Sequence, residues 1–385
     1  MKVMTNFRYR VKVPGKLLIA GEYAVLEPNQ LAIVAAINRY VTAYIGTAKE
    51  NQLSLVQLGL EQIKWEAYKE DVKFSIEDPR LKYIRNSLLV VNQFLHENSI
   101  TPCPFKLTIE SELNDPLTGK KYGFGSSAAV VTAVVSAVLA LHREPNNPPL
   151  LEQIFKLSAI AHIKTQKSGS GADIAASTFG GWLAYSAFDS SWLVNEMAQG
   201  TNLTGLIHKD WPGLSVTTIQ PPKPLKLCVG WTGEPISTAV MIKKVAELKE
   251  NSPNLYREFL NESAKAVSTI LTSFRVADCS EAISGLRDNR HALKKLEGDA
   301  GCLIETPMLT KLCTVAEQYG SGKSSGAGGG DCGIAFLKDA AQVGTLYDMW
   351  KEHHIHPVKV AVSQMGAAIT DYDCETSLKE PFCKM

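Results

Sequence analysis

A stretch of glycines and serines is the part of this sequence best suited to chemistry. It reads Lys121-Tyr122-Gly123-Phe124-Gly125-Ser126-Ser127-Ala128-Ala129 and leads into a long apolar run. The pattern predicts a loop that enters the N-terminus of a helix, where backbone N–H groups lack intrahelical partners and the helix dipole is positive. Because glycine lets a bulky anion approach those N–H groups closely, the stretch indicates a phosphate site. Taken alone, it also fits an ordinary serine-capped helix after a flexible loop.

Two more loops of small residues follow later in the chain. They read Ser168-Gly169-Ser170-Gly171-Ala172-Asp173 and Lys323-Ser324-Ser325-Gly326-Ala327-Gly328-Gly329-Gly330-Asp331. Each of them can offer backbone N–H groups to an anion, so the three loops together predict a ligand with several phosphates.

Charged side chains beside these loops fit phosphoryl transfer. Lys16 follows a Pro-Gly break, Lys120 and Lys121 flank the first loop, and Asp173 begins an expected short helix. Each also has a plain structural explanation, since aspartate is common near helix N-termini and lysine is mostly solvated. The case for phosphoryl transfer therefore depends on their occurring together.

Two common nucleotide motifs do not match. Gly322-Lys323-Ser324 supplies the end of a Walker A motif, but Glu317 stands where its first glycine is needed. The residues from Gly123 to Ala128 fit the dinucleotide pattern G-x-G-x-x-A, yet a polar turn precedes them and the next acidic residue is Glu144. That pattern needs a strand directly before it, so the sequence argues against nicotinamide binding.

Composition limits the class of protein. The chain has 385 residues, more than one hydrophobic core usually serves, so two domains are expected. The net charge of +1 predicts neither nucleic acid nor anionic lipid as a partner. Eight scattered cysteines without metal-site spacing, and a first segment unlike a signal peptide, predict a cytoplasmic protein. The longest apolar run, residues 128–141, is too short for a membrane span and predicts a buried helix.

Hydrophobic periodicity predicts alternating strands and helices, with an α+β arrangement in the second half. Strands are expected at residues 8–13, 16–20, 31–48, 53–60, 105–110, 182–186, 225–231, 332–337 and 357–362, and residues 31–48 fit either one long strand or a bent pair. Helices are expected at residues 83–97, from the first loop to 141, at 151–165, 173–179 and 340–353, with three or four more between 237 and 319.

Three segments together resemble the motifs of the GHMP kinases, small-molecule kinases that do not use Walker A. The segments are residues 14–26, 121–141 and 323–337. The first, Pro-Gly-Lys-Leu-Leu-Ile-Ala-Gly-Glu-Tyr-Ala-Val-Leu-Glu-Pro, is most similar to the bacterial branch of the family that phosphorylates 5-phosphomevalonate. Mevalonate kinases, by contrast, tend to carry histidine where Tyr23 stands. Residues 227–238 also resemble that branch, and the similarity extends over about residues 11–363.

The resemblance implies a fold and a reaction. The fold would be α+β, with a ribosomal-protein-like α/β domain over residues 1–222 and a ferredoxin-like α+β domain over 223–385. The reaction would be ATP- and Mg²⁺-dependent phosphorylation of 5-phosphomevalonate to 5-diphosphomevalonate, a step of isoprenoid precursor synthesis in the mevalonate pathway. A sibling kinase acting on an alcohol such as mevalonate is the nearest alternative, and a non-catalytic ligand sensor is a more distant one. The oligomeric state, monomer or homodimer, is left open.

The resemblance also implies roles for individual residues. The catalytic pair would be Lys16 and Asp173. ATP would bind at Lys121, Gly123, Phe124, Gly125, Ser126, Ser127 and Ala128, with Ser127 reaching Mg²⁺. The acceptor would bind at Lys16, Tyr23, Ser170, Ser237, Thr238, Ser325, Gly326, Ala327 and Gly328.

One position departs from the family pattern. Mevalonate kinases carry a Mg²⁺-binding glutamate eleven residues before the catalytic aspartate, and here His162 occupies that place. Histidine is a poor Mg²⁺ ligand, so ATP oxygens, water and a serine are expected to hold the metal. A phosphate monoester with a second pKa of about 6 is mostly dianionic at neutral pH. We therefore expect Lys16 and Mg²⁺ to carry catalysis, and Asp173 to orient Lys16 more than to abstract a proton.

Overall fold

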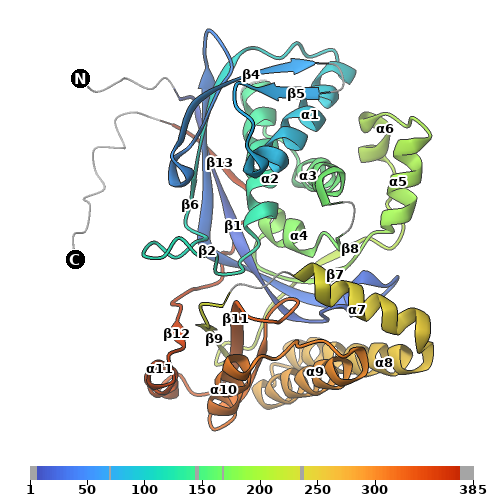
Figure 1. The fold of residues 1–385 in the computed structure, drawn as a ribbon, viewed down its shortest axis with the longest axis vertical. Helices are drawn as coiled ribbons and strands as arrows, with labels where there is room; N and C mark the ends of the chain where they lie inside the picture. The colour runs from blue at the N-terminus through green and yellow to red at the C-terminus, as the bar shows by residue number, and fades with distance from the viewer. Residues whose placement is uncertain (1–6, 69–70, 144–146, 167–168, 235–237, 373–385) are drawn as a thin grey trace.

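The computed structural model describes residues 7–68, 71–143, 147–166, 169–234 and 238–372. Figure 1 shows two parts, a large sheet with helices packed against it and, below it, a smaller sheet flanked by long helices. The mixture of helix and sheet in each part agrees with the predicted α+β class.

The large sheet is built around β1 and β2. Its order is β13-β1-β2-β6-β3-β4-β5, and β7 and β8 continue it from β2. The long β2, rich in valine, isoleucine and alanine, pairs with β1 along one edge, and its other edge pairs with β6 along one half and β7 along the other. The strands are β1 (Tyr9–Ala20), β2 (Leu31–Thr47), β3 (Gln52–Leu55), β4 (Leu60–Tyr68), β5 (Asp71–Phe74), β6 (Phe105–Ser111), β7 (Trp182–Ser186), β8 (Ser215–Ile219) and β13 (Ala368–Asp371).

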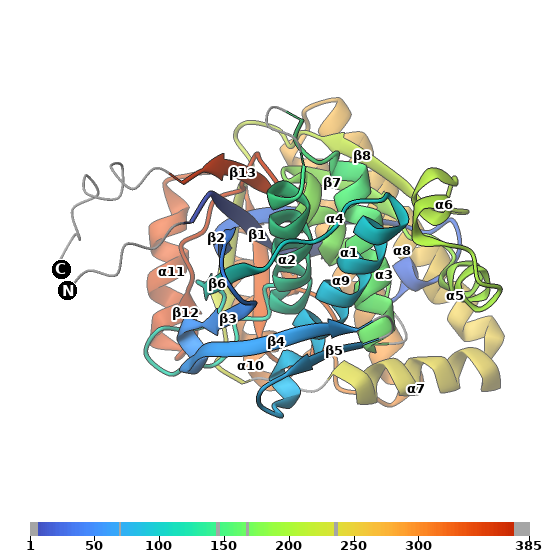
Figure 2. The same ribbon diagram turned by 90° about the horizontal axis from the view of Figure 1, so that it is seen from above.

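Helix α2 (Ser126–Leu141) is the central helix of this part. It lies against β1 and β2 and packs beside α1 (Lys82–Glu97) and α3 (Leu151–Gln166), which also contact each other (Figure 2). Because it is covered on every side, its sequence is apolar all round, as expected for a buried helix. No helix in the described residues is long and apolar enough to cross a membrane. Three shorter helices complete this part: α4 (Ala172–Phe179), α5 (Ser190–Ala198) and α6 (Leu203–His208).

The smaller sheet has the strand order β10-β11-β9-β12, with every pair antiparallel. Numbered within the sheet, this order is 2-3-1-4, which is the ferredoxin-like arrangement that the sequence predicted. Its strands are β9 (Lys226–Trp231), β10 (Gly320–Ser324), β11 (Cys332–Leu337) and β12 (His356–Pro357). Its helices are α7 (Thr238–Asn251), α8 (Pro253–Arg275), α9 (Cys279–Ala300), α10 (Pro307–Ala316) and α11 (Gln342–Glu352).

The chain passes from the large sheet to the small one between β8 and β9, across the proline-rich residues 221–224. It later returns, because β13 pairs with β1 in the large sheet. The division at residue 222 stays a prediction, and residues 368–371 belong by hydrogen bonding to the N-terminal sheet.

Two expected elements near the N-terminus differ from the structure. Residues 9–20 form one strand rather than two, and the register shift between Pro14 and Gly15 marks a bulge where a break was expected. Residues 53–60 do not form one strand, because a 3-10 turn (Val56–Leu58) and Gly59, with φ of 63°, separate β3 from β4.

Two more differences lie in the C-terminal part. Lys323 and Ser324 end strand β10, where a loop was expected, because the strand's small residues let helix α10 pack closely. A Cβ on Gly322 would lie only 2.8 Å from the Cβ of Ala316. Of the strand expected at 357–362, only β12 forms, and Val362 makes an isolated bridge to Ile37 of the large sheet.

Candidate active site

The first glycine loop adopts a conformation that demands glycine. Gly123 and Gly125 have φ values of 85° and 75°, which L side chains rarely adopt. Gly125 directly precedes Ser126, the first residue of α2, so the N–H groups at the start of this helix are next to the loop. The predicted phosphate site thus has the expected local geometry, on a helix that the core holds rigidly.

Strand β1 brings Lys16 to this loop. The N–H of Lys16 donates to the carbonyl of Phe124 at 2.9 Å, and its Nζ lies 3.4 Å from the carbonyl of Gly123. A Cβ on Gly125 would lie 2.9 Å from Cγ of Lys16, so the lysine stem lies directly on the glycine. Within the described chain no ion pair involves Lys16, which leaves its ammonium available to an anion.

Helix α4 brings Asp173 to the same point. The would-be Cβ of Gly125 lies 3.6 Å from Cβ of Asp173, and Oδ1 of Asp173 accepts from the N–H of Ile174 at 3.0 Å. The hydroxyl of Ser177, further along α4, donates to the carbonyl of Pro14 at 2.8 Å and ties the helix to β1. The two predicted catalytic residues therefore both lie close to Gly125, although their charged ends do not form an ion pair.

A hollow of about 230 Å³ opens beside these residues. We call it the second hollow, to distinguish it from the first hollow described below. Ile242 and the third loop contribute to its lining from the C-terminal part, so it lies between the two parts. Six predicted site residues share its wall: Lys16, Tyr23, Ser170, Asp173, Gly326 and Ala327. The structure therefore brings together most of the residues predicted for the acceptor.

Other predicted acceptor residues are placed differently. The hydroxyl of Ser325 donates to the carbonyl of Leu18 at 2.9 Å, and a Cβ on Gly328 would lie 2.3 Å from the carbonyl of Ile304. These residues hold the third loop in place rather than line the second hollow. Thr238 is the first residue of α7, and Ser237 lies outside the described residues.

Tyr23 joins the two parts of the chain across the second hollow. Tyr23 follows strand β1 and has φ of 60°. Its hydroxyl donates to the carbonyl of Ala327 in the third loop. Burial raises the pKa of its hydroxyl, so it stays protonated and remains a donor at neutral pH. Next to Tyr23 in the chain, buried Glu22 pairs with the ammonium of buried Lys323. This ion pair also links the third loop to residues 14–26.

A larger hollow, the first hollow, lies on the other side of the glycine loop. It has a volume of about 400 Å³ and includes Lys121, Ser126 and Ser127 in its lining. The apolar part of its wall comes from Leu55, Leu58, Pro79, Tyr83, Ile84, Ile109 and Val130, and the polar part from Gln57, Arg80, Lys82, Ser111 and Asn114. An apolar slot next to a phosphate loop can hold a nucleobase. Sequence reasoning missed these residues, because they come from separate segments of the chain and carry no motif.

Two of the predicted ATP residues that have a side chain do not expose it to the site. Phe124 and Ala128 are buried, so their side chains belong to the core. The two hollows approach each other at Ser127 and His162, whose Oγ and Nε2 atoms lie 3.4 Å apart. Ser127 lines the first hollow and His162 the second, so a group passed from one hollow to the other would pass near this contact.

The donor set fits a magnesium ion only in part. The described residues hold no group of three His, Cys, Asp or Glu side chains that could enclose a metal. Mg²⁺ usually keeps several waters and binds phosphate oxygens, so the Ser127 hydroxyl beside the loop is a reasonable single protein ligand. His162 beside Ser127 can orient that hydroxyl but is not expected to bind Mg²⁺.

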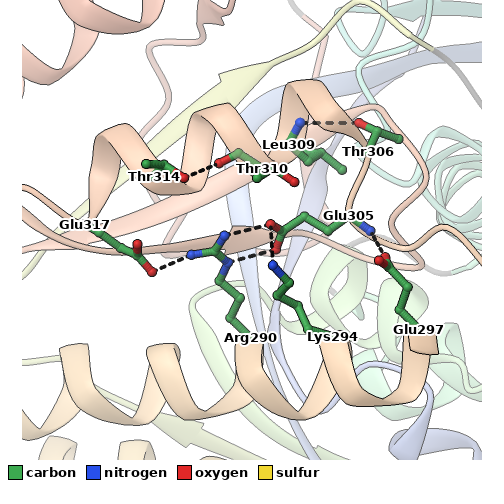
Figure 3. A network of polar contacts seen from close by, with 9 residues as sticks. All are labelled: Arg290, Lys294, Glu297, Glu305, Thr306, Leu309, Thr310, Thr314 and Glu317. Atoms are coloured by element: carbon green, nitrogen blue, oxygen red, sulfur yellow. Dashed lines mark hydrogen bonds and ion pairs between the residues drawn. The ribbon is translucent and has the colours of Figure 1, made fainter. Parts of the chain in front are cut away.

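An ion-pair network joins α9 to the segment just before α10 and to Glu317 just after it (Figure 3). Arg290 of α9 makes two hydrogen bonds to the carboxylate of Glu305, at 2.8 and 2.7 Å, and also reaches Glu317. The residue before Glu305 supplies a carbonyl that accepts from the N–H of Gly329 at 2.6 Å. Burial acts to raise the pKa of Glu305, but the hydrogen bonds and charge of Arg290 outweigh it and hold that pKa below its ordinary value. The carboxylate is thus charged and fixed at neutral pH.

Comparison with known proteins agrees with this geometry. Family models for the N-terminal and C-terminal domains of GHMP kinases match residues 82–181 and 279–356. A phosphomevalonate kinase from Streptomyces sp. (strain CL190) is 33% identical over 369 residues, which cover 92% of this chain and 96% of that protein.

Solved structures show the same similarity. The Lin0012 protein from Listeria innocua is 33% identical, with a TM-score of 0.87 over 95% of this chain and 99% of that one. Phosphomevalonate kinase from Streptococcus pneumoniae, solved with phosphomevalonate and AMPPNP, is 28% identical, with a TM-score of 0.79 over 92% of this chain and 99% of that one. The predicted two-domain fold and the predicted family are both confirmed. The chain belongs to the GHMP kinases and, within that family, to the phosphomevalonate kinases.

Proposed function

We propose that this chain transfers the γ-phosphoryl group of ATP to the phosphate of 5-phosphomevalonate, which yields ADP and 5-diphosphomevalonate. One observation carries the proposal: the first and second hollows approach each other at Ser127 and His162, with Lys16 and Asp173 beside the same glycine loop. The related enzyme solved with phosphomevalonate and AMPPNP supports the choice of substrates. We place the reaction in the cytoplasm, with small molecules as its partners.

In this scheme the first hollow takes the nucleobase, and the N–H groups at the start of α2 bind the phosphates. The acceptor lies in the second hollow and offers a phosphate oxygen that is already anionic at neutral pH. The main barrier is then the repulsion between two anions. Lys16, whose ammonium has no ion-pair partner among the described residues, lowers that repulsion at the transferred group. The Ser127 hydroxyl would help to hold Mg²⁺, which would neutralise further charge.

Asp173 acts in this scheme by position. Its Cβ lies close to Gly125, as the stem of Lys16 does, and its carboxylate accepts from the N–H of Ile174. An acceptor that is already dianionic has no proton to lose, so the scheme needs no general base. Asp173 instead keeps the lysine directed toward the phosphates.

The deciding experiment offers two acceptors to the purified protein. ATP and Mg²⁺ are supplied with either 5-phosphomevalonate or mevalonate, and ADP release is followed together with carbon dioxide. The proposal expects ADP release with 5-phosphomevalonate, no carbon dioxide, and loss of the signal in Lys16→Met. ADP release with mevalonate alone would assign the chain to alcohol phosphorylation, and carbon dioxide release would assign it to decarboxylation.

A further inference from the structure

Asp331, at the end of the third loop, is held by its backbone in an unusual conformation. Its φ of 54° is rare for a residue other than glycine. Its carbonyl accepts from both the N–H and the hydroxyl of Thr232, at 2.9 and 3.0 Å, and its N–H donates to the carbonyl of Glu234 at 2.9 Å. Three hydrogen bonds thus hold a strained residue, which fixes the direction of its side chain.

The carboxylate of Asp331 lies against the phosphate loop. A Cβ on Gly123 would lie only 2.8 Å from Oδ2 of Asp331, and the carbonyl of the same glycine faces the ammonium of Lys16. The other oxygen, Oδ1, is buried and has no hydrogen-bond partner among the described residues. An anionic oxygen therefore lies beside a site built for anions, without a donor to satisfy it.

This position costs the folded state free energy. Burial raises the pKa of Asp331, and the charges of Lys16 and Lys121 lower it without cancelling the increase. The ionised carboxylate is therefore less stable in the folded chain than in the unfolded one. An uncompensated charge of this kind in an active site is a sign of function rather than of stability.

We propose that Asp331 is a positioning residue for phosphoryl transfer, whose carboxylate attracts Lys16 and holds its ammonium at the carbonyl of Gly123. The inference rests on the proposed function, because it assigns Lys16 to the transferred group. Asp173 lies beside Gly125, on which the stem of Lys16 rests, whereas Asp331 lies beside Gly123, whose carbonyl faces the ammonium of Lys16. The lysine donors that remain then point toward the phosphates.

The inference predicts that the variant Asp331→Asn loses activity without losing thermal stability. Asp331→Asn keeps the size of the side chain but removes the charge that attracts Lys16. We expect kcat to fall about 100-fold, the effect of a roughly 1 Å misplacement of a reacting group. The KM values for ATP and acceptor should change far less, because the N–H groups that bind the phosphates are untouched. The melting temperature should stay the same or rise, since a buried charge without a partner is gone.

Asp299→Asn is the matched control. Asp299 is also partly buried and has a carboxylate oxygen without a hydrogen-bond partner among the described residues, but it lies on α9 and lines neither hollow. Its kcat should stay at the wild-type value. If Asp331→Asn keeps the wild-type kcat, or loses kcat together with melting temperature, Asp331 has only a structural role and the inference is overturned.

A double variant identifies the lysine through which Asp331 acts. If the partner is Lys16, the losses of Asp331→Asn and Lys121→Ala should multiply, since independent effects add in free energy. If Asp331→Asn costs nothing further once Lys121 is removed, the partner is Lys121 and the inference is wrong. All variants are assayed with whichever acceptor the wild type phosphorylates. Failure of the proposed substrate therefore appears in the wild type, separately from any effect of Asp331.

Discussion

Gly125→Ala tests whether the contact between Gly125 and the stem of Lys16 positions the lysine for catalysis. The new residue would have to adopt φ of 75°, which costs an L residue about 1–2 kcal/mol. Its Cβ would also lie 2.9 Å from Cγ and 3.2 Å from Cε of Lys16. Carbon atoms prefer a separation of about 3.5–4.0 Å, so the lysine stem must move by roughly 0.5–1 Å. A shift of that size at a reacting group can lower the rate by about 100-fold.

Gly200→Ala separates backbone strain from the contact with Lys16. Gly200 has φ of 81°, and a Cβ there would meet nothing within 4 Å. Both variants should lose similar melting temperature, because both carry the same backbone strain. Only Gly125→Ala should lose kcat in a coupled assay of ADP release. If Gly125→Ala and Gly200→Ala have the same kcat, the contact between Gly125 and Lys16 has no part in catalysis, and the prediction is wrong.

Three further predictions concern charge and contact between the two parts of the chain. At pH 7, Lys16→Met should lose far more kcat than Asp173→Asn; an equal loss that recovers at high pH would show instead that Asp173 is a base. Because the pKa of Glu305 is held below its ordinary value of 4.5, that residue contributes stability above this pH and loses it as the pH falls. The melting temperature of Glu305→Gln should therefore be lower than wild type at pH 7, and the gap should close on acidification below 4.5; a constant gap would contradict the argument. Tyr23→Phe removes the hydrogen bond to Ala327 and should cost about 1 kcal/mol in unfolding free energy and raise the KM for the acceptor, whereas an unchanged KM would limit Tyr23 to a structural role.

Much of the fold was predictable where local pattern and burial agree. The run after the glycine loop is apolar on all sides, and it forms the buried helix α2. The long β2 and the helix α1 were also predicted, because their periodicity extends over many residues. The short strands β5, β8, β10 and β13 were missed, since their pairing partners, rather than their own sequences, decide that they are strands.

The candidate site divides in a similar way. The glycine loop, Lys16 and Asp173 could be proposed because motifs of small residues beside charges carry a chemical meaning of their own. The apolar wall of the first hollow could not be, since ordinary leucines and prolines become a site only when folding places them side by side. Tyr23 was expected to face the acceptor, yet its hydroxyl also holds the third loop through Ala327.

The sequence by itself determined which groups are available. These are three loops of small residues that can bind phosphates, together with Lys16 and Asp173, and the chain has no Walker A motif. Tertiary structure decided their distances and charges. Asp331 shows the difference, because in the sequence it is simply the residue that ends a glycine run. Pairing of β10 with β11, and the hydrogen bonds from Thr232, bring its carboxylate against Gly123, some two hundred residues earlier in the chain. Desolvation and the field of neighbouring charges act through space, so no local pattern of residues encodes them.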